Sequence, residues 1–259
     1  MIGLRLFILI AAPLFCVSPF SFAQVRARFH DIGVFSGVSI PFNAEYGINS
    51  HASTGSHIEL AWDWNLDKKL ALGAEFQFIH HSLDENSILR ELKREFAGDM
   101  QTEKSITRFS STDFKHRIAL LNLRYIFPLS PAWWIDSKSG MGINFYQVPN
   151  ASWTASIVQE SDFIHEKKSM ISAPNCLTLV FSTGLGISHC WNNQWGVRFS
   201  FMYYNSTSLS YVETKTEEFS NASGQRVIEI QQAYKDVSAS WLNLQVGLTR
   251  YFRQRLDRK

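Results

Sequence analysis

The chain is poor in cysteine and in charge. Its 259 residues include three cysteines and 19% charged side chains, and the formal net charge is +2. Three cysteines are too few for a disulfide-stapled mini-domain or a cysteine-rich zinc module, and the balanced charge excludes a strongly basic nucleic-acid-binding protein. We therefore expect no metal, no cofactor and no nucleic-acid partner. With 45% hydrophobic residues the composition is that of a folded chain rather than a disordered one.

Common catalytic motifs and long apolar runs are also missing. The sequence contains no GxSxG, HExxH, phosphate-binding loop or CxxC motif. After residue 23, no run of apolar residues approaches the length of about 18 that a transmembrane helix needs. We therefore expect neither a helical membrane protein nor an enzyme of the common hydrolytic or nucleotide-binding classes.

Residues 1–23 are expected to be a cleaved secretory signal. Arg5 is followed by an apolar run from Leu6 to Val17 and then by a small-residue site that ends at Ala23, which is the usual order of such a signal. Cleavage would leave Gln24 as the first residue of the mature chain. The alternative is a membrane anchor, but the run of 12 residues is shorter than the roughly 20 that span a bilayer.

Eight later segments alternate apolar and polar residues with period two, as β-strands do. They are residues 30–41, 54–65, 69–80, 113–127, 133–147, 175–189, 194–205 and 236–252. Three connections are short, and four are long. The long connections are residues 42–53, 81–112, 148–174 and 206–235. Alternating short turns and long loops are typical of outer-membrane barrels, whereas structureless loops of about 30 residues are uncommon in compact soluble domains.

The last segment, LNLQVGLTRYF, resembles the C-terminal assembly signal of outer-membrane barrels, with Gly247, Tyr251 and the terminal aromatic Phe252. With its architecture over residues 28–252, the chain resembles the eight-stranded outer-membrane barrels of Gram-negative-type bacteria, namely the OmpX, Ail, Opa and OmpW-like group and the membrane domains of OmpA-type proteins. The resemblance implies an all-β, eight-stranded antiparallel transmembrane β-barrel with short periplasmic turns and four long extracellular loops.

The same resemblance implies a location and a set of partners. The barrel would occupy residues 24–252 and be followed by a short basic periplasmic tail, residues 253–259. It would be integral to the cell outer membrane, inserted there by the outer-membrane assembly machinery, and in contact with outer-membrane lipid and lipopolysaccharide. The long loops would offer contact with a host or surface ligand.

Seven charged residues are expected on the inward face of the barrel. They are Glu59, Asp63, Glu75, Arg124, Asp136, Lys138 and Arg198. Because side chains fill an eight-stranded interior and buried charges need partners, we expect a salt-bridged plug, with a narrow polar path as the alternative. Periodicity does not tell inside from outside, so a soluble eight-stranded cup with its apolar faces inward is also compatible with the pattern.

Aromatic residues gather near both ends of the predicted strands, which predicts two interfacial girdles. Those near the short turns or the C-terminal end are Trp62, Trp64, Tyr125, Phe127, Trp133, Trp195 and Phe252. Those toward the long loops are Phe78, Phe114, Phe145, Tyr203 and Trp241.

Candidate chemistry is sparse. His80 and Ser82 are expected on the outer face, and such a pair weakly resembles the His-x-Ser of PagL-type lipid A deacylases. A nucleophile also needs a base within hydrogen-bond distance and a third, orienting group, so ordinary residues at the start of a loop are the simpler interpretation. Cys176 and Cys190 would lie about 46 Å apart on one extended strand, too far for a disulfide.

Residues 87–96 show helical spacing of apolar residues, with Asp84 or Asn86 as possible caps. This predicts a short amphipathic helix that packs on the barrel rim or contacts lipopolysaccharide or a host ligand. Three functions follow for the chain. The first is a surface interaction or structural protein that presents long loops, the second a channel for small, including hydrophobic, molecules, and the third a lipid A-modifying enzyme.

Overall fold

The structure is a computed structural model that describes residues 28–42, 52–90, 103–158, 164–172, 174–191, 194–220 and 225–253. The predicted signal sequence, with Ala23 and Gln24 at its cleavage site, lies outside these residues, as do residues 254–259 of the predicted tail. No helix in the described ranges is long and apolar enough to cross a membrane.

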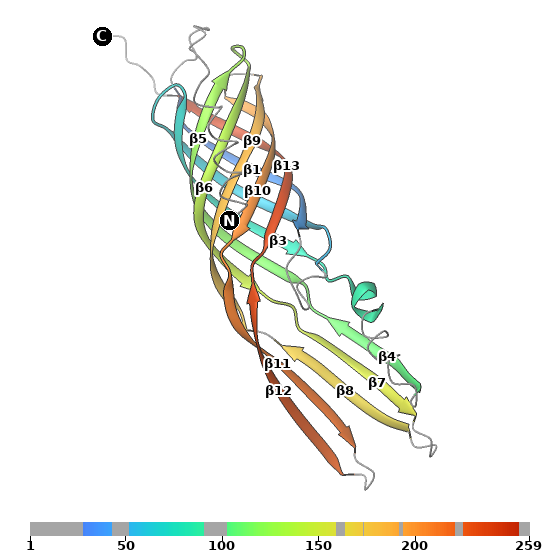
Figure 1. Ribbon diagram of the computed structural model, residues 1–259. Helices are drawn as coiled ribbons and strands as arrows, with labels where there is room; N and C mark the ends of the chain where they lie inside the picture. The colour runs from blue at the N-terminus through green and yellow to red at the C-terminus, as the bar shows by residue number, and fades with distance from the viewer. Residues whose placement is uncertain are drawn as a thin grey trace, which may run out of the picture.

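Eight long antiparallel strands form a closed barrel (Figure 1). They are β1 (Arg28–Phe42), β2 (Gly55–Asn65), β3 (Leu70–His81), β5 (Phe114–Pro128), β6 (Trp133–Gln147), β9 (Cys176–Cys190), β10 (Trp195–Ser206) and β13 (Ser240–Arg253). Their order around the barrel is β1-β13-β10-β9-β6-β5-β3-β2, and the first and last strands pair from His30–Phe252 to Phe42–Ser240. Each predicted segment forms one of these strands, which confirms the predicted fold class.

The apolar side chains of the barrel point outward and the polar ones inward. Phe76 and Leu121 on the outer wall are 56% and 65% exposed, whereas Glu59 and Glu75 inside are 0% and 1% exposed. A soluble cup would need the opposite arrangement, because water solvates a polar outer face and an apolar outer face is stable only in lipid. The outer wall is therefore a membrane-facing surface.

The aromatic girdles are present, with two corrections. Trp62, Trp64 and Trp133 are exposed on the outer wall near the short turns, and Phe78 and Phe145 are exposed near the long loops.

The prediction that Phe114 and Trp241 belong to the outer girdle is wrong, because both are buried inside the barrel. Phe114 lies two residues before the inward-facing His116 on β5, and Trp241 lies two residues before the inward-facing Asn243 on β13. Residues two apart on a strand share a face, so both side chains point inward.

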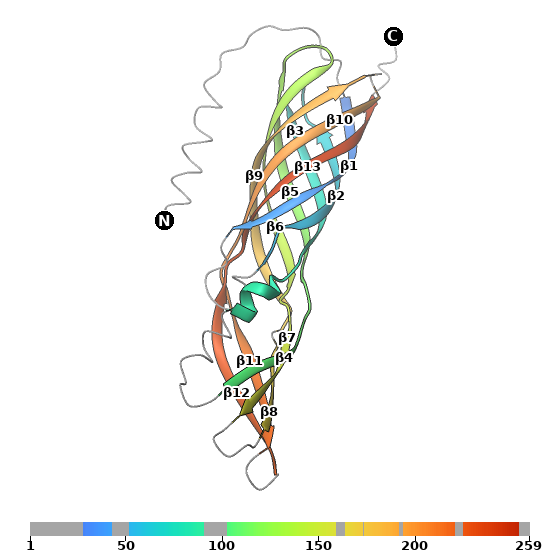
Figure 2. The same cartoon turned by 90° about the vertical axis from the view of Figure 1, so that its right-hand side faces the viewer.

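Three of the four long connections contain strands rather than irregular loops. These are β4 (Glu103–Ser111), β7 (Ala151–Val158), β8 (Ile164–Ser172), β11 (Leu209–Ser220) and β12 (Arg226–Val237). They form a five-stranded sheet in the order β12-β11-β8-β7-β4. Each of these strands directly precedes or follows a barrel strand in the chain. The barrel strands concerned are, in the same order, β13-β10-β9-β6-β5. Because pairing continues from one set into the other, one side of the barrel wall extends far beyond the rim (Figures 1 and 2).

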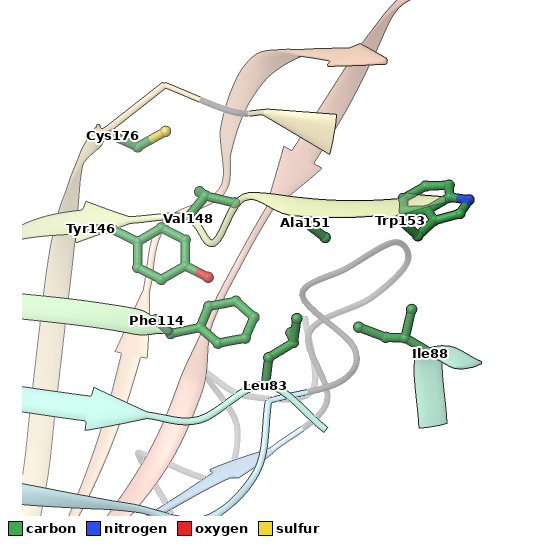
Figure 3. Packing of buried hydrophobic residues seen from close by; sticks show 8 residues of the cluster. All are labelled: Leu83, Ile88, Phe114, Tyr146, Val148, Ala151, Trp153 and Cys176. Atoms are coloured by element: carbon green, nitrogen blue, oxygen red, sulfur yellow. The ribbon is translucent and has the colours of Figure 1, made fainter. Parts of the chain in front are cut away.

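A cluster of buried apolar side chains lies where the five-stranded sheet begins. It consists of Leu83, Ile88, Phe114, Tyr146, Val148, Ala151, Trp153 and Cys176, which Figure 3 shows gathered from the barrel strands, β7 and the segment after β3. Ile88 belongs to the helical residues 85–90, and the Asp84 carboxylate caps them by accepting a hydrogen bond from the Ser87 amide at 3.1 Å. The rest of the predicted helix, residues 91–96, lies outside the described residues.

Candidate functional site

The seven charged residues predicted on the inward face all lie buried inside the barrel. The deepest group surrounds Lys138, whose ammonium forms an ion pair with Glu75 and lies 3.5 Å from Glu59 Oε1. Gln77 Nε2 donates hydrogen bonds to Glu59 Oε2 at 3.1 Å and to Tyr204 Oη at 2.7 Å. Lys138 thus joins two carboxylates from neighbouring strands, and the Gln77 amide links this group to the Tyr204 hydroxyl.

Two arginines form the other ionic contacts. Arg124 lies 2.8 Å from Asp63 Oδ2 and 2.6 Å from Asp31 Oδ2, and Arg198 forms an ion pair with Asp136. All of these side chains are buried, and a buried cation without a partner would be very costly. The three cations therefore tie together β1, β2, β3, β5, β6 and β10 from the inside.

Asp31 also belongs to this network, although it was not among the predicted inward charges. The alternation of residues 30–41 is irregular because glycines occupy two of the inward positions, Gly33 and Gly37. The period of two still provides the signal, because Asp31 lies four residues before the inward-facing Phe35 and therefore on the same face of the strand. The register that brings Asp31 to Arg124 could not be predicted, because these residues lie 93 positions apart.

Apolar layers enclose the ionic network along the barrel axis. Toward the short turns lie Ile126, Trp134, Cys190 and Tyr251, with the rings of Trp134 and Tyr251 edge to face at 5.5 Å. Toward the long loops lie Ile79, Ile118, Leu120, Val180, Met202, Tyr204 and Trp241, with Tyr204 stacked on Trp241 at 5.4 Å. The charges therefore lie between two apolar layers, and the rim cluster adds a third.

A layer of histidines, which the sequence did not predict, lies between the rim cluster and the apolar layer toward the long loops. His81 Nε2 lies 2.8 Å from Ser39 Oγ, and His116 Nδ1 lies 3.1 Å from Asn144 Nδ2. The His116 ring packs 4.9 Å from the ring of Trp241. Each imidazole thus has a neutral polar partner at one of its two ring nitrogens.

The structure does not join His80 and Ser82 into a catalytic pair. Both side chains are exposed, but His80 Nε2 contacts Asp113 Oδ2 at 2.9 Å, and the Ser82 carbonyl oxygen accepts hydrogen bonds from Ser53. No hydrogen bond connects the two side chains in the described part of the chain. No group of three or more His, Cys, Asp or Glu side chains within the described ranges has a metal-binding arrangement.

The C-terminal strand closes the barrel through close packing at Gly247. A Cβ atom at this position would lie 2.2 Å from Phe35 Cδ1, so only glycine fits beneath the Phe35 ring. Tyr251 points inward and is buried. Phe252 stacks on His30 at 4.5 Å. The outward Arg250 lies over the Phe252 ring at 5.1 Å, a favourable cation–π geometry.

Cys176 and Cys190 are both free and buried. They occupy the first and last positions of β9, so one belongs to the rim cluster and the other to the layer near the short turns. The expectation that they lie on one extended strand is confirmed.

The five-stranded sheet carries an exposed apolar row on the face that continues the outer wall. Ile230 and Met170, which are 62% and 47% exposed, flank Thr216 in register on three adjacent strands. Ile228 and Tyr234 extend the row along β12 and are also exposed. β12 is an edge strand, and no described strand pairs with its outer side.

No protein-family model matches the chain, and no curated protein matches it. Solved structures that it is similar to include a major outer membrane protein from Thermus thermophilus, with 12% identity, 86% of this chain and 99% of that chain covered, and a TM-score of 0.43.

Neisserial surface protein A has 12% identity, coverage of 86% and 97%, and a TM-score of 0.39. OprG from Pseudomonas aeruginosa has 9% identity, coverage of 90% and 100%, and a TM-score of 0.40. By its own strand order and its apolar outer wall, this chain is an eight-stranded transmembrane β-barrel of the outer-membrane type.

Proposed function

We propose that the protein is an integral outer-membrane protein that binds a protein partner outside the cell through its five-stranded sheet. The barrel anchors this sheet, with the short turns in the periplasm and the long connections outside. In this proposal the outer-membrane assembly machinery inserts the barrel, and residues 1–23 direct the chain out of the cytoplasm.

The observation that carries the proposal is the exposed apolar row on a sheet fixed to the barrel wall. Apolar patches on the water-exposed part of a protein mark interaction sites, and an unpaired edge strand offers backbone groups for the addition of a partner's strand. Ile228, Ile230 and Tyr234 lie on the same edge strand, β12. An extended segment of a partner could therefore pair with β12 and cover these side chains.

The interior supports an anchor rather than a channel. A channel for small molecules would need a path past Lys138, Arg124 and Arg198, each of which is held by buried carboxylates between apolar layers. Transport remains the second candidate function, and a flux that changes with Glu75, Lys138 or Arg198 would support it. The third candidate is a lipid A-modifying enzyme. It would require that lipid A loses an acyl chain when the protein is expressed and that this loss depends on Ser82.

A matched pair of surface variants tests the proposal. Ile230→Lys and Gln231→Lys change adjacent, exposed residues that face opposite sides of β12. Cells that display the wild type, either variant, or a chain with residues 209–237 replaced by a short Gly-Ser linker are tested for adherence to immobilised extracellular-matrix proteins and to epithelial cells.

We expect Ile230→Lys and the linker variant to lose adherence and Gln231→Lys to retain it. Equal adherence of all four chains would refute a binding role for the sheet. Heat-dependent gel migration of each chain would verify that its barrel is folded.

A further inference from the structure

The outer wall of β5 changes character near the long loops. Its outward residues Leu123, Leu121 and Ala119 are apolar, and the next two, Arg117 and Lys115, are basic. Both basic side chains are exposed, and neither forms an ion pair with a described residue. A lipid-facing strand therefore ends in two cations that have no counter-charge among the described residues.

The position of these cations matches the edge of the lipid layer. Arg117 lies ten residues from the interfacial Phe127 at the other end of β5. Ten residues span about 33 Å along the strand, or about 25 Å along the barrel axis at a tilt near 40°, which is the height of the apolar band of such barrels. Arg117 thus lies level with the lipid headgroups of the leaflet next to the long loops, and Lys115 lies just beyond.

The neighbouring strands complete an amphipathic site. Arg117 is opposite Phe78 on β3 and Phe145 on β6, both exposed toward lipid. Directly opposite residues in an antiparallel sheet have Cβ atoms about 5 Å apart, so the Arg117 side chain leaves the wall between two aromatic residues. One step deeper, Ala119 lies between the larger Phe76 and Ile143. A hydrocarbon chain could pack over the small alanine.

Among the described residues, the row of side chains around Lys115 contains one carboxylate, that of Asp113. Lys115 is opposite His80 and Gln147. The nearby carboxylate, Asp113, is already engaged by His80 Nε2 at 2.9 Å. The corresponding boundary residues Ser56 on β2 and Asn205 on β10 are neutral. Neither of these two strands therefore carries a cation at this boundary.

We propose that Arg117 and Lys115 bind the phosphate group of a phosphorylated lipid in the outer leaflet, with an acyl chain packed over Ala119. The guanidinium can donate two parallel hydrogen bonds to phosphate oxygens, and the lysine ammonium adds a point charge. This inference rests on the proposed orientation, in which the long connections lie outside the cell. It does not depend on what the five-stranded sheet binds.

The test measures lipid binding by the refolded mature chain in neutral detergent, with native mass spectrometry as the readout. The probes are lipid A with two phosphates, the same lipid with its phosphates removed, and inorganic phosphate as a competitor. Lys115→Gln/Arg117→Gln removes both charges, and Lys68→Gln/Lys69→Gln removes two exposed lysines from the short turn at the opposite end. Arg117→Lys keeps the charge but loses the bidentate geometry.

We expect phosphorylated lipid A to bind the Lys115→Gln/Arg117→Gln chain about tenfold more weakly than the wild type, which is the loss of roughly one charge-assisted contact. The Lys68→Gln/Lys69→Gln chain should match the wild type, and Arg117→Lys should bind with intermediate affinity. The phosphate-free lipid should bind weakly to every chain.

Equal binding by the double variant and the wild type, or equal binding of the phosphate-free lipid, would overturn the proposal. Complete displacement by inorganic phosphate would show a free-anion site instead of a lipid site. Because adherence is measured separately with Ile230→Lys, failure of the lipid site and failure of the sheet as a binding surface give different results. Heat-dependent gel migration again verifies folding.

Discussion

Lys138→Met should strongly destabilise the barrel, because it removes the cation from a buried ionic group. Lys138, Glu59 and Glu75 are all buried, and the ammonium is the cation that both carboxylates contact. Methionine keeps most of the volume of the lysine stem, so packing changes little and the loss is electrostatic. Breaking a buried ion pair by removing one partner costs about 3–5 kcal/mol.

This cost is large compared with the whole stability of a folded domain, which is about 5–15 kcal/mol. Urea unfolding of the barrel in lipid vesicles, followed by the fluorescence of its eight tryptophans, measures the change. Lys69→Met in an exposed turn is the control and should change the free energy of unfolding by no more than about 0.5 kcal/mol.

A triple variant separates the charge effect from a packing effect. Glu59→Gln/Glu75→Gln/Lys138→Met removes all three charges, and replacing a buried ionic group as a whole is often neutral or stabilising. We expect it to recover most of the stability that Lys138→Met loses. If Lys138→Met unfolds at the same urea concentration as the wild type, the ammonium is solvated by water, and the argument for an enclosed ionic layer fails.

Gly247→Ala should lower the folded fraction seen by heat-dependent gel migration, because its Cβ would lie 2.4 Å from the Val34 carbonyl oxygen; folding as complete as that of a Thr249→Ala control would contradict this. Trp134→Ala should cost about 3–5 kcal/mol in urea unfolding, since it empties the layer near the short turns, while the exposed Trp191→Ala should cost far less. Reductant should leave gel migration unchanged because Cys176 and Cys190 are free, and a shift would reveal a disulfide.

The barrel was predictable because the two faces of its wall lie in different environments. Lipid outside and polar side chains inside impose a strict period of two, which is visible in residues 69–80 and 194–205. The same parity also placed the seven inward charges. It should have placed Phe114 and Trp241 inside as well, but their aromatic character near a loop favoured the girdle assignment, and parity proved the better guide.

The five-stranded sheet and the pairing of the charges were not predictable from the sequence. β12 is largely exposed on both faces, so no solvent difference imposes alternation on it, and it resembles a polar loop. The contacts of Arg124 with Asp31 and of Lys138 with Glu59 depend on strand register over 93 and 79 residues. Local sequence patterns carry no information on such distant pairs.

In the proposed function the barrel is a closed anchor, and binding takes place on its outer surfaces. Ion conductance of the refolded barrel in a planar bilayer, with a boiled sample as the control, distinguishes a closed anchor from an open channel. We expect a folded but silent barrel, because Lys138, Arg124 and Arg198 are paired between apolar layers. Discrete, reproducible openings that are absent from the boiled sample would contradict it and would place the function inside the barrel.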